Sequence, residues 1–148
     1  MSSYINTALR RLVAVRAEAL CEYCLIHEDD AFFGCEVDHI ISEKHDGPTE
    51  ANNLAYACAF CNRSKGSDVG SIVQRTGAFV RFFNPRIDLW AEHFVLDGVR
   101  IVPLSDIGEV TTRILDFNSE ERLFEWQTLH TIGRYPSAAA VERMRRRP

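Results

Sequence analysis

Lysine is scarce in this chain. Of the 17 basic residues, only Lys44 and Lys65 are lysines. Basic residues do not outnumber acidic ones either, because the formal net charge is −4. The charge argues against a protein that coats nucleic acid through bulk electrostatics. Any phosphate contact must therefore be local and made by particular arginines, whose planar guanidinium suits bidentate phosphate binding. A genomic preference for arginine codons explains the same composition equally well.

Long apolar runs are missing too. No stretch reaches the roughly 18 consecutive apolar residues that a membrane-spanning helix needs. Residues 1–6 lack the basic segment and apolar stretch of a secretory signal. We therefore expect no membrane association and a cytoplasmic location, where thiols stay reduced and bind metal more readily than they form disulfides. Hydrophobic residues make up 46% of the 148, enough for a globular core.

Four of the five cysteines form two C-x-x-C pairs, Cys21 with Cys24 and Cys58 with Cys61. Four thiolates at this spacing can close a tetrahedral zinc site with no open position. Neither pair follows a thioredoxin-like pattern, which disfavours a redox role. The fifth cysteine, Cys35, stands alone, and we expect it in the core or near the surface rather than as a ligand.

Hard oxygen and imidazole groups lie between and just after the pairs. Asp38 and His39 are adjacent, Asn52 and Asn53 follow, and Asn62 comes directly after the second pair. Carboxylate and amide oxygens suit an ion of the magnesium class, and an imidazole suits a general base. A lone histidine is most often a core residue, but this grouping favours a site.

In order and spacing, the motifs C-x-x-C, D-H-I, N-N-L and C-x-x-C-N-x-x-K-G of residues 16–68 resemble the HNH endonuclease family, in its four-cysteine, zinc-stabilised branch. The resemblance implies an α+β protein with a ββα-metal, treble-clef-like core and a structural Zn²⁺ on the four cysteines. It also implies His39 as general base, Asp38 and Asn62 as ligands of a catalytic Mg²⁺ or Mn²⁺, and Asn53 as the residue that orients His39. The third motif position, often histidine, is Asn62 here, which makes the chain an HNN variant.

The implied activity is hydrolysis of DNA phosphodiester bonds, with double-stranded DNA as the partner. Arg16, Arg63 and Lys65 are close to the site in sequence and are expected to hold phosphates, a solvated surface role being the alternative. A chain of 148 residues leaves little room for a sequence-reading domain, so a partner protein or a homodimer is plausible. The competing function is a non-catalytic zinc module that binds nucleic acid or protein, which would not need Asp38, His39 and Asn62 together.

Because the resemblance covers residues 16–68, we expect a nuclease core at 1–78 and an extension at 79–148. The core is expected to contain a helix at 3–20 capped by Ser2 or Ser3, a hairpin with strands at 36–41 and 53–58, and a helix at 60–67. The extension is expected to contain strands with a turn at Asp97-Gly98, a helix from 105 or 106 to 117 and a helix from 118 or 119 to 132. The basic residues 134–148 are expected to form a mobile tail.

Overall fold

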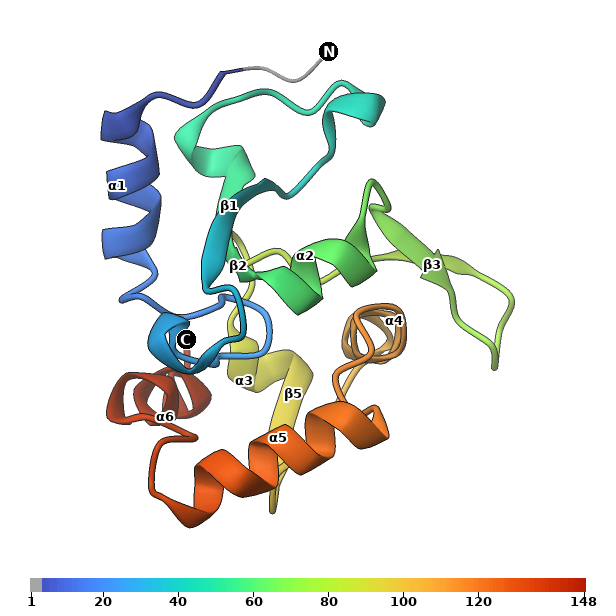
Figure 1. The fold of residues 1–148 in the computed structure, drawn as a ribbon. Coiled ribbons are helices and arrows are strands. Elements are labelled where there is room, and N and C mark those ends of the chain that lie inside the picture. The colour runs from blue at the N-terminus through green and yellow to red at the C-terminus, as the bar shows by residue number, and fades with distance from the viewer. Residues whose placement is uncertain (1–3) are drawn as a thin grey trace.

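The computed structural model describes residues 4–148 and combines helices with small antiparallel strand pairs, which confirms the predicted α+β class (Figure 1). No helix among these residues is long and apolar enough to span a membrane. The α-helices are α1 (Thr7–Arg16), α2 (Ala59–Lys65), α3 (Trp90–His93), α4 (Asp106–Ile114), α5 (Glu120–Thr131) and α6 (Ala138–Arg145). The strands are β1 (Cys35–His39), β2 (Leu54–Cys58), β3 (Gly70–Ile72), β4 (Phe79–Arg81), β5 (Phe94–Asp97) and β6 (Arg100–Pro103), and three short 3₁₀ turns cover Glu28–Asp30, Glu43–His45 and Ala51–Asn53.

The β1–β2 hairpin followed by α2 forms the ββα unit predicted from the sequence (Figure 1). Its register pairs Cys35 with Cys58 at one end and His39 with Leu54 at the other. Cys58 is also the N-cap of α2, and its sulfur accepts a hydrogen bond from the backbone N–H of Cys61 at 3.4 Å. The hairpin therefore separates the cysteine end from the His39 end by its whole length.

The first helix is shorter than predicted. It begins after Asn6, whose side chain accepts a hydrogen bond from a backbone N–H of the first turn at 2.8 Å. It ends before Glu18 and Ala19, which adopt left-handed φ angles of 56° and 60° and so cannot continue a right-handed helix. The predicted caps Ser2 and Ser3 lie outside the described residues.

Strand β3 was not predicted, since the glycines around residue 70 suggested only that α2 ends or bends there. Gly70 pairs with Arg81 of β4. A Cβ at position 70 would lie 2.4 Å from the carbonyl oxygen of Val80, so glycine is needed for the close approach of the two strands.

One hydrophobic core runs through both halves of the chain. Leu20 and Tyr23 from the first half belong to the same buried cluster as Phe94, Trp126 and Tyr135 from the second. Figure 1 accordingly shows α3, α5 and α6 packed beneath the segment that carries the cysteines. The hydrophobic core therefore extends across the boundary at residue 78.

The prediction of a mobile tail at 134–148 is wrong for most of that segment. Residues 138–145 form α6, capped by the Ser137 hydroxyl, and Ala140 is fully buried. Arg143 donates to the carbonyl of Arg16 at 2.9 Å and to the Glu18 carboxylate at 3.3 Å. The basic composition suggested a solvated segment, but its small alanine face packs on the core and its Arg143 binds the end of α1.

Candidate metal centre and active site

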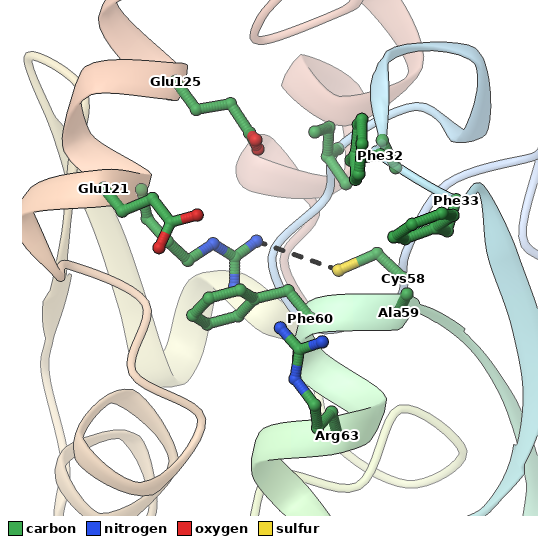
Figure 2. A pocket seen from close by; sticks show the side chains of 11 residues that line it. Phe32, Phe33, Cys58, Ala59, Phe60, Arg63, Glu121 and Glu125 are labelled. Carbon is green, nitrogen blue, oxygen red and sulfur yellow. Dashed lines mark hydrogen bonds between the residues drawn. The ribbon is translucent and has the colours of Figure 1, made fainter.

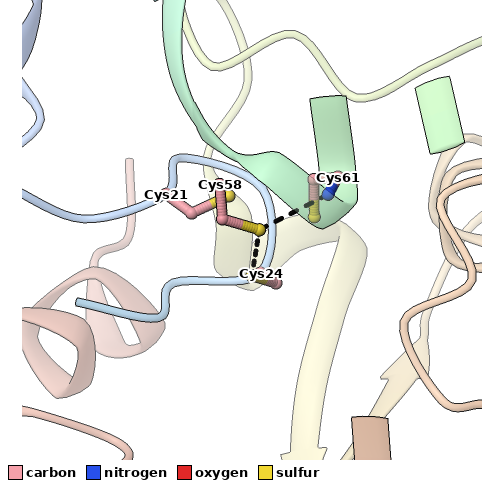
Figure 3. Close-up of side chains that lie close together, drawn as sticks. All are labelled: Cys21, Cys24, Cys58 and Cys61. Carbon is pink, nitrogen blue, oxygen red and sulfur yellow. Dashed lines mark hydrogen bonds between the residues drawn. The ribbon is translucent and has the colours of Figure 1, made fainter. Parts of the chain in front are cut away.

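The two C-x-x-C pairs meet at one point, as Figure 3 shows. The four sulfurs of Cys21, Cys24, Cys58 and Cys61 all lie within 4.8 Å of one another, and all four residues are buried. The Cys24 and Cys58 sulfurs are 3.8 Å apart. Tetrahedral zinc with Zn–S bonds of about 2.3 Å requires sulfurs roughly 3.8 Å apart, so this donor set fits zinc.

The cysteine cluster excludes Cys35, as expected from the sequence. Cys35 sits opposite Cys58 in the hairpin but is not among the four residues whose sulfurs converge. Burial raises the pKa of its thiol well above the ordinary value, and the neighbouring Cys58 raises it further. Cys35 therefore lies beside the cysteine cluster without belonging to it.

His39 ends β1, and its ring is held by two side chains that sequence reasoning missed. Its Nε2 atom lies 2.9 Å from the Thr49 hydroxyl and 3.4 Å from the Glu43 carboxylate. The His39 side chain keeps 16% of its exposure, so the ring is anchored at one nitrogen and still reaches the surface. Glu43 follows His39 by four residues, but no helix pattern in that segment indicated that the two would meet.

Asn53 holds the backbone just after His39, as the sequence analysis expects. Its carboxamide accepts a hydrogen bond from the Ile41 N–H at 2.9 Å and donates to the Ile41 and Pro48 carbonyls at 3.0 and 2.9 Å. The loop that carries Glu43 and Thr49 is thereby tied to β1. Gly47 makes this possible, because a Cβ there would lie 1.7 Å from the Ile41 oxygen.

Helix α2 lies along the face of β1 that carries Asp38. Asn62 donates to the Glu36 carboxylate at 3.3 Å, and Lys65, one turn later, lies 3.0 Å from Asp38 Oδ2. Glu36 and Asp38 are two residues apart and point to the same side of the strand. The Asn62–Glu36 and Lys65–Asp38 contacts are one helical turn apart on α2 and two residues apart on β1. Asn62 and Asp38 therefore lie on the side of β1 that faces α2, with Glu36 as an additional carboxylate.

Asp38 is a largely buried carboxylate with one charged partner. Its Oδ2 atom is buried and accepts no well-directed hydrogen bond, although the Lys65 ammonium pairs with it. Burial raises the pKa of the Asp38 carboxyl above its ordinary value, and the positive charge of Lys65 offsets part of that rise. A carboxylate oxygen, an amide oxygen and a nearby second carboxylate suit a hard ion such as Mg²⁺ or Mn²⁺.

Comparison with known proteins bears on this arrangement. Residues 21–68 match the family model of the HNH endonuclease. The matched segment contains both cysteine pairs, the Asp38-His39 dipeptide and the three asparagines Asn52, Asn53 and Asn62, and it confirms the resemblance found in the sequence. No curated protein and no solved structure matches the chain.

The three basic residues expected at phosphates occupy different places in and around the HNH segment. The Arg16 guanidinium donates to the Ala51 and Leu54 carbonyls at 2.9 and 2.7 Å and so clamps the start of β2. Lys65 is 1% exposed and donates to the His39 carbonyl at 2.9 Å. Arg63, in contrast, is exposed and lies over the Phe60 ring. Arg63 is thus the one of the three whose cation faces solvent.

Lys65→Met is expected to destabilise the protein by roughly 3 kcal/mol, the lower end for breaking a buried ion pair, because Asp38 would be left without its countercharge. The free energy of unfolding in urea measures this loss. Lys44→Met, at the only other lysine and on the surface, is the matched control and should have little effect. Adding Asp38→Asn to Lys65→Met should recover part of the loss, and equal, additive losses from the two substitutions would contradict the pairing.

Proposed function

We propose that this protein is a metal-dependent endonuclease that hydrolyses phosphodiester bonds in double-stranded DNA. The observation that supports this most strongly is the register between α2 and β1, which brings Asn62 to the Asp38 side of the strand next to His39. A carboxylate, an amide and an imidazole carried by the β1–α2 unit of a segment that matches HNH endonucleases suit a phosphodiester hydrolase.

His39 is the general base of this proposal. With the proton on Nε2, the ring donates toward Glu43 and Thr49, and the lone pair of Nδ1 is available to a water molecule. The Glu43 carboxylate then stabilises the imidazolium that forms when the ring accepts the water proton, as an acidic partner of a catalytic histidine does elsewhere. Glu43 and Thr49 are positioning residues, since they act through His39.

Asp38 and Asn62 would hold Mg²⁺ or Mn²⁺. Because the Asn62 Nδ2 group donates to Glu36, its oxygen is left to face an ion. When bound, the ion supplies stabilisation of the negative charge that develops on the scissile phosphate and the leaving oxygen. Attack of water at phosphorus with departure of the 3′ oxygen gives 5′-phosphate and 3′-hydroxyl ends.

Arg63 is the proposed phosphate contact. It follows Asn62 directly on α2, and its guanidinium is exposed. Lys65 and Arg16 act differently in this proposal, because their cations already bind backbone oxygens near His39 and at the start of β2. They fix the shape of the site and leave the phosphate contact to Arg63. Any further contacts with DNA would come from a partner protein or a second copy of the chain.

The competing proposal is a zinc module that binds nucleic acid without cutting it. Such a module needs the four cysteines but gains nothing from Glu43 and Thr49 holding the His39 ring. Cleavage of a supercoiled plasmid with and without Mn²⁺ separates the two functions. Nicked or linear product that depends on Mn²⁺ supports the nuclease, and retarded but intact plasmid supports the binding module.

Asn62→Ala is expected to lower plasmid cleavage by roughly 100-fold or more while zinc content and fold are retained. Even outer partners of metal ligands are worth about 10–100-fold, and Asn62 is placed as a direct ligand. Asn52→Ala, an exposed neighbour of Asn53, is the matched control and should cut like the unmodified protein. Cleavage that survives brief EDTA treatment, with zinc still bound, would rule out the exchangeable ion.

A further inference from the structure

An arginine from the C-terminal half reaches the cysteine cluster. Arg122 lies in the first turn of α5, and its Nη2 atom is 3.1 Å from the Cys24 sulfur, 98 residues away in the chain. Its Nη1 atom is 3.3 Å from the Cys61 sulfur, and Nη2 also lies 3.8 Å from the sulfur of Cys58. Figure 2 shows the contact with Cys58 as a dashed line. Three of the four cluster sulfurs thus have a guanidinium partner.

The position of this guanidinium is fixed by aromatic rings. Its central carbon lies 4.2 Å from the centre of the Phe60 ring and 4.5 Å from that of the Trp126 ring. Arg122 as a whole is only 2% exposed. Rings at this distance attract a cation and leave the planar group free to donate along its edge. The N–H groups on the edge of the guanidinium point at the sulfurs of Cys24 and Cys61.

A buried cation needs a negative partner. Within residues 4–148 the hydrogen bonds of the Arg122 guanidinium all go to cysteine sulfur. Glu121 and Glu125 line the same pocket but are more exposed, so with neutral thiols the buried charge would be only partly compensated, which is costly. Four thiolates around one Zn²⁺ carry an excess of two negative charges, and these lie where the arginine can offset them. The arginine and the thiolate cluster are therefore complementary in charge as well as in geometry.

We propose that Arg122 is the built-in counterion of the zinc–thiolate cluster, and that α5 completes the metal centre from outside the HNH segment. The N–H···S bonds offset negative charge on the sulfurs and hold them in place around the ion, which slows zinc release. Zinc binding in turn creates the anion that the buried arginine requires, so metal binding and the docking of α5 stabilise each other. This inference rests on the zinc site and does not depend on nuclease activity.

The test is zinc release from the full-length, zinc-loaded protein to a chromogenic chelator, without nucleic acid. Arg122→Met keeps the length and packing of the side chain but removes the charge and the donors. We expect this variant to release zinc about 10–100-fold faster, the range for loss of an outer partner of a metal ligand. Arg63→Met is the matched control, because Arg63 also lies over the Phe60 ring, at 5.8 Å, but faces solvent. It should release zinc at the original rate.

Arg122→Lys covers the case in which Arg122→Met does not fold. An ammonium keeps the charge but cannot bridge two sulfurs as the guanidinium does, so release should be accelerated by a smaller factor. The proposal is overturned if a folded Arg122→Met releases zinc within twofold of the original rate. It is equally overturned if Arg122→Met fails to fold while Arg122→Lys releases zinc at the original rate. Absence of plasmid cleavage by the unmodified, zinc-loaded protein would count against the proposed function and would leave the comparison of zinc-release rates unaffected.

Discussion

Cys58→Ser is expected to abolish zinc binding and to leave the protein unfolded or aggregated at room temperature. Zinc bound to a closed four-thiolate site contributes on the order of 10 kcal/mol to the folding of small modules. Single domains are stable by only about 5–15 kcal/mol in total. Cys58 also caps α2 and pairs with β1, so its loss disturbs helix, hairpin and metal together.

Metal analysis of purified protein and thermal unfolding measure this effect. Cys35→Ser is the matched control, since Cys35 lies opposite Cys58 in the hairpin but outside the sulfur cluster. It should retain zinc and melt close to the temperature of the unmodified protein. A Cys58→Ser protein that stays folded without zinc would show that the four cysteines form no structural metal site.

His39→Ala is expected to reduce the rate of DNA cleavage by roughly 10²–10⁴-fold, the usual worth of a positioned general base. Removing the imidazole leaves the proposed ion ligands Asp38 and Asn62 in place, but water must then lose its proton unaided. Stability should change little, because the His39 contacts with Thr49 and Glu43 lie in a partly exposed region. Single-turnover cleavage of a plasmid at saturating Mn²⁺ measures the rate.

His45→Ala provides the comparison for this experiment. His45 ends the short 3₁₀ turn that begins at Glu43, and its side chain is exposed. Both variants should keep the zinc content and melting temperature of the unmodified protein, and only His39→Ala should cut slowly. If His39→Ala folds, holds zinc and cuts at the original rate, another group must accept the proton.

Much of the site could be predicted from sequence because its parts are encoded at short range. Two residues between paired cysteines fix a turn that presents both sulfurs, and this spacing is readable without a structure. The strands predicted at 36–41 and 53–58 agree with β1 and β2 to within two residues at each end. The contact of Asn53 with the backbone near His39 was expected from the family resemblance, and it spans only one hairpin.

Only the tertiary structure could place the charged side chains. Sequence proximity suggested that Lys65 and Arg16 hold phosphate, but Lys65 reaches the carbonyl of His39, 26 residues away, and Arg16 clamps the start of β2. For the same reason, the sequence did not predict that Glu43 lies beside His39 or that the basic tail contains a helix. A long, flexible basic side chain is compatible with many partners, and docking of distant segments decides which partner it meets.

By itself, then, the sequence determined which four cysteines come together as a possible metal site, the hairpin and helix that carry Asp38, His39 and Asn62, and the α+β class. The tertiary structure decided that the C-terminal half is packed into one core with them and that Arg122 reaches the cysteine sulfurs. The physical reason is distance along the chain. Local spacing and periodicity specify turns, strands and helices, whereas burial of a charge depends on partners that only folding brings together.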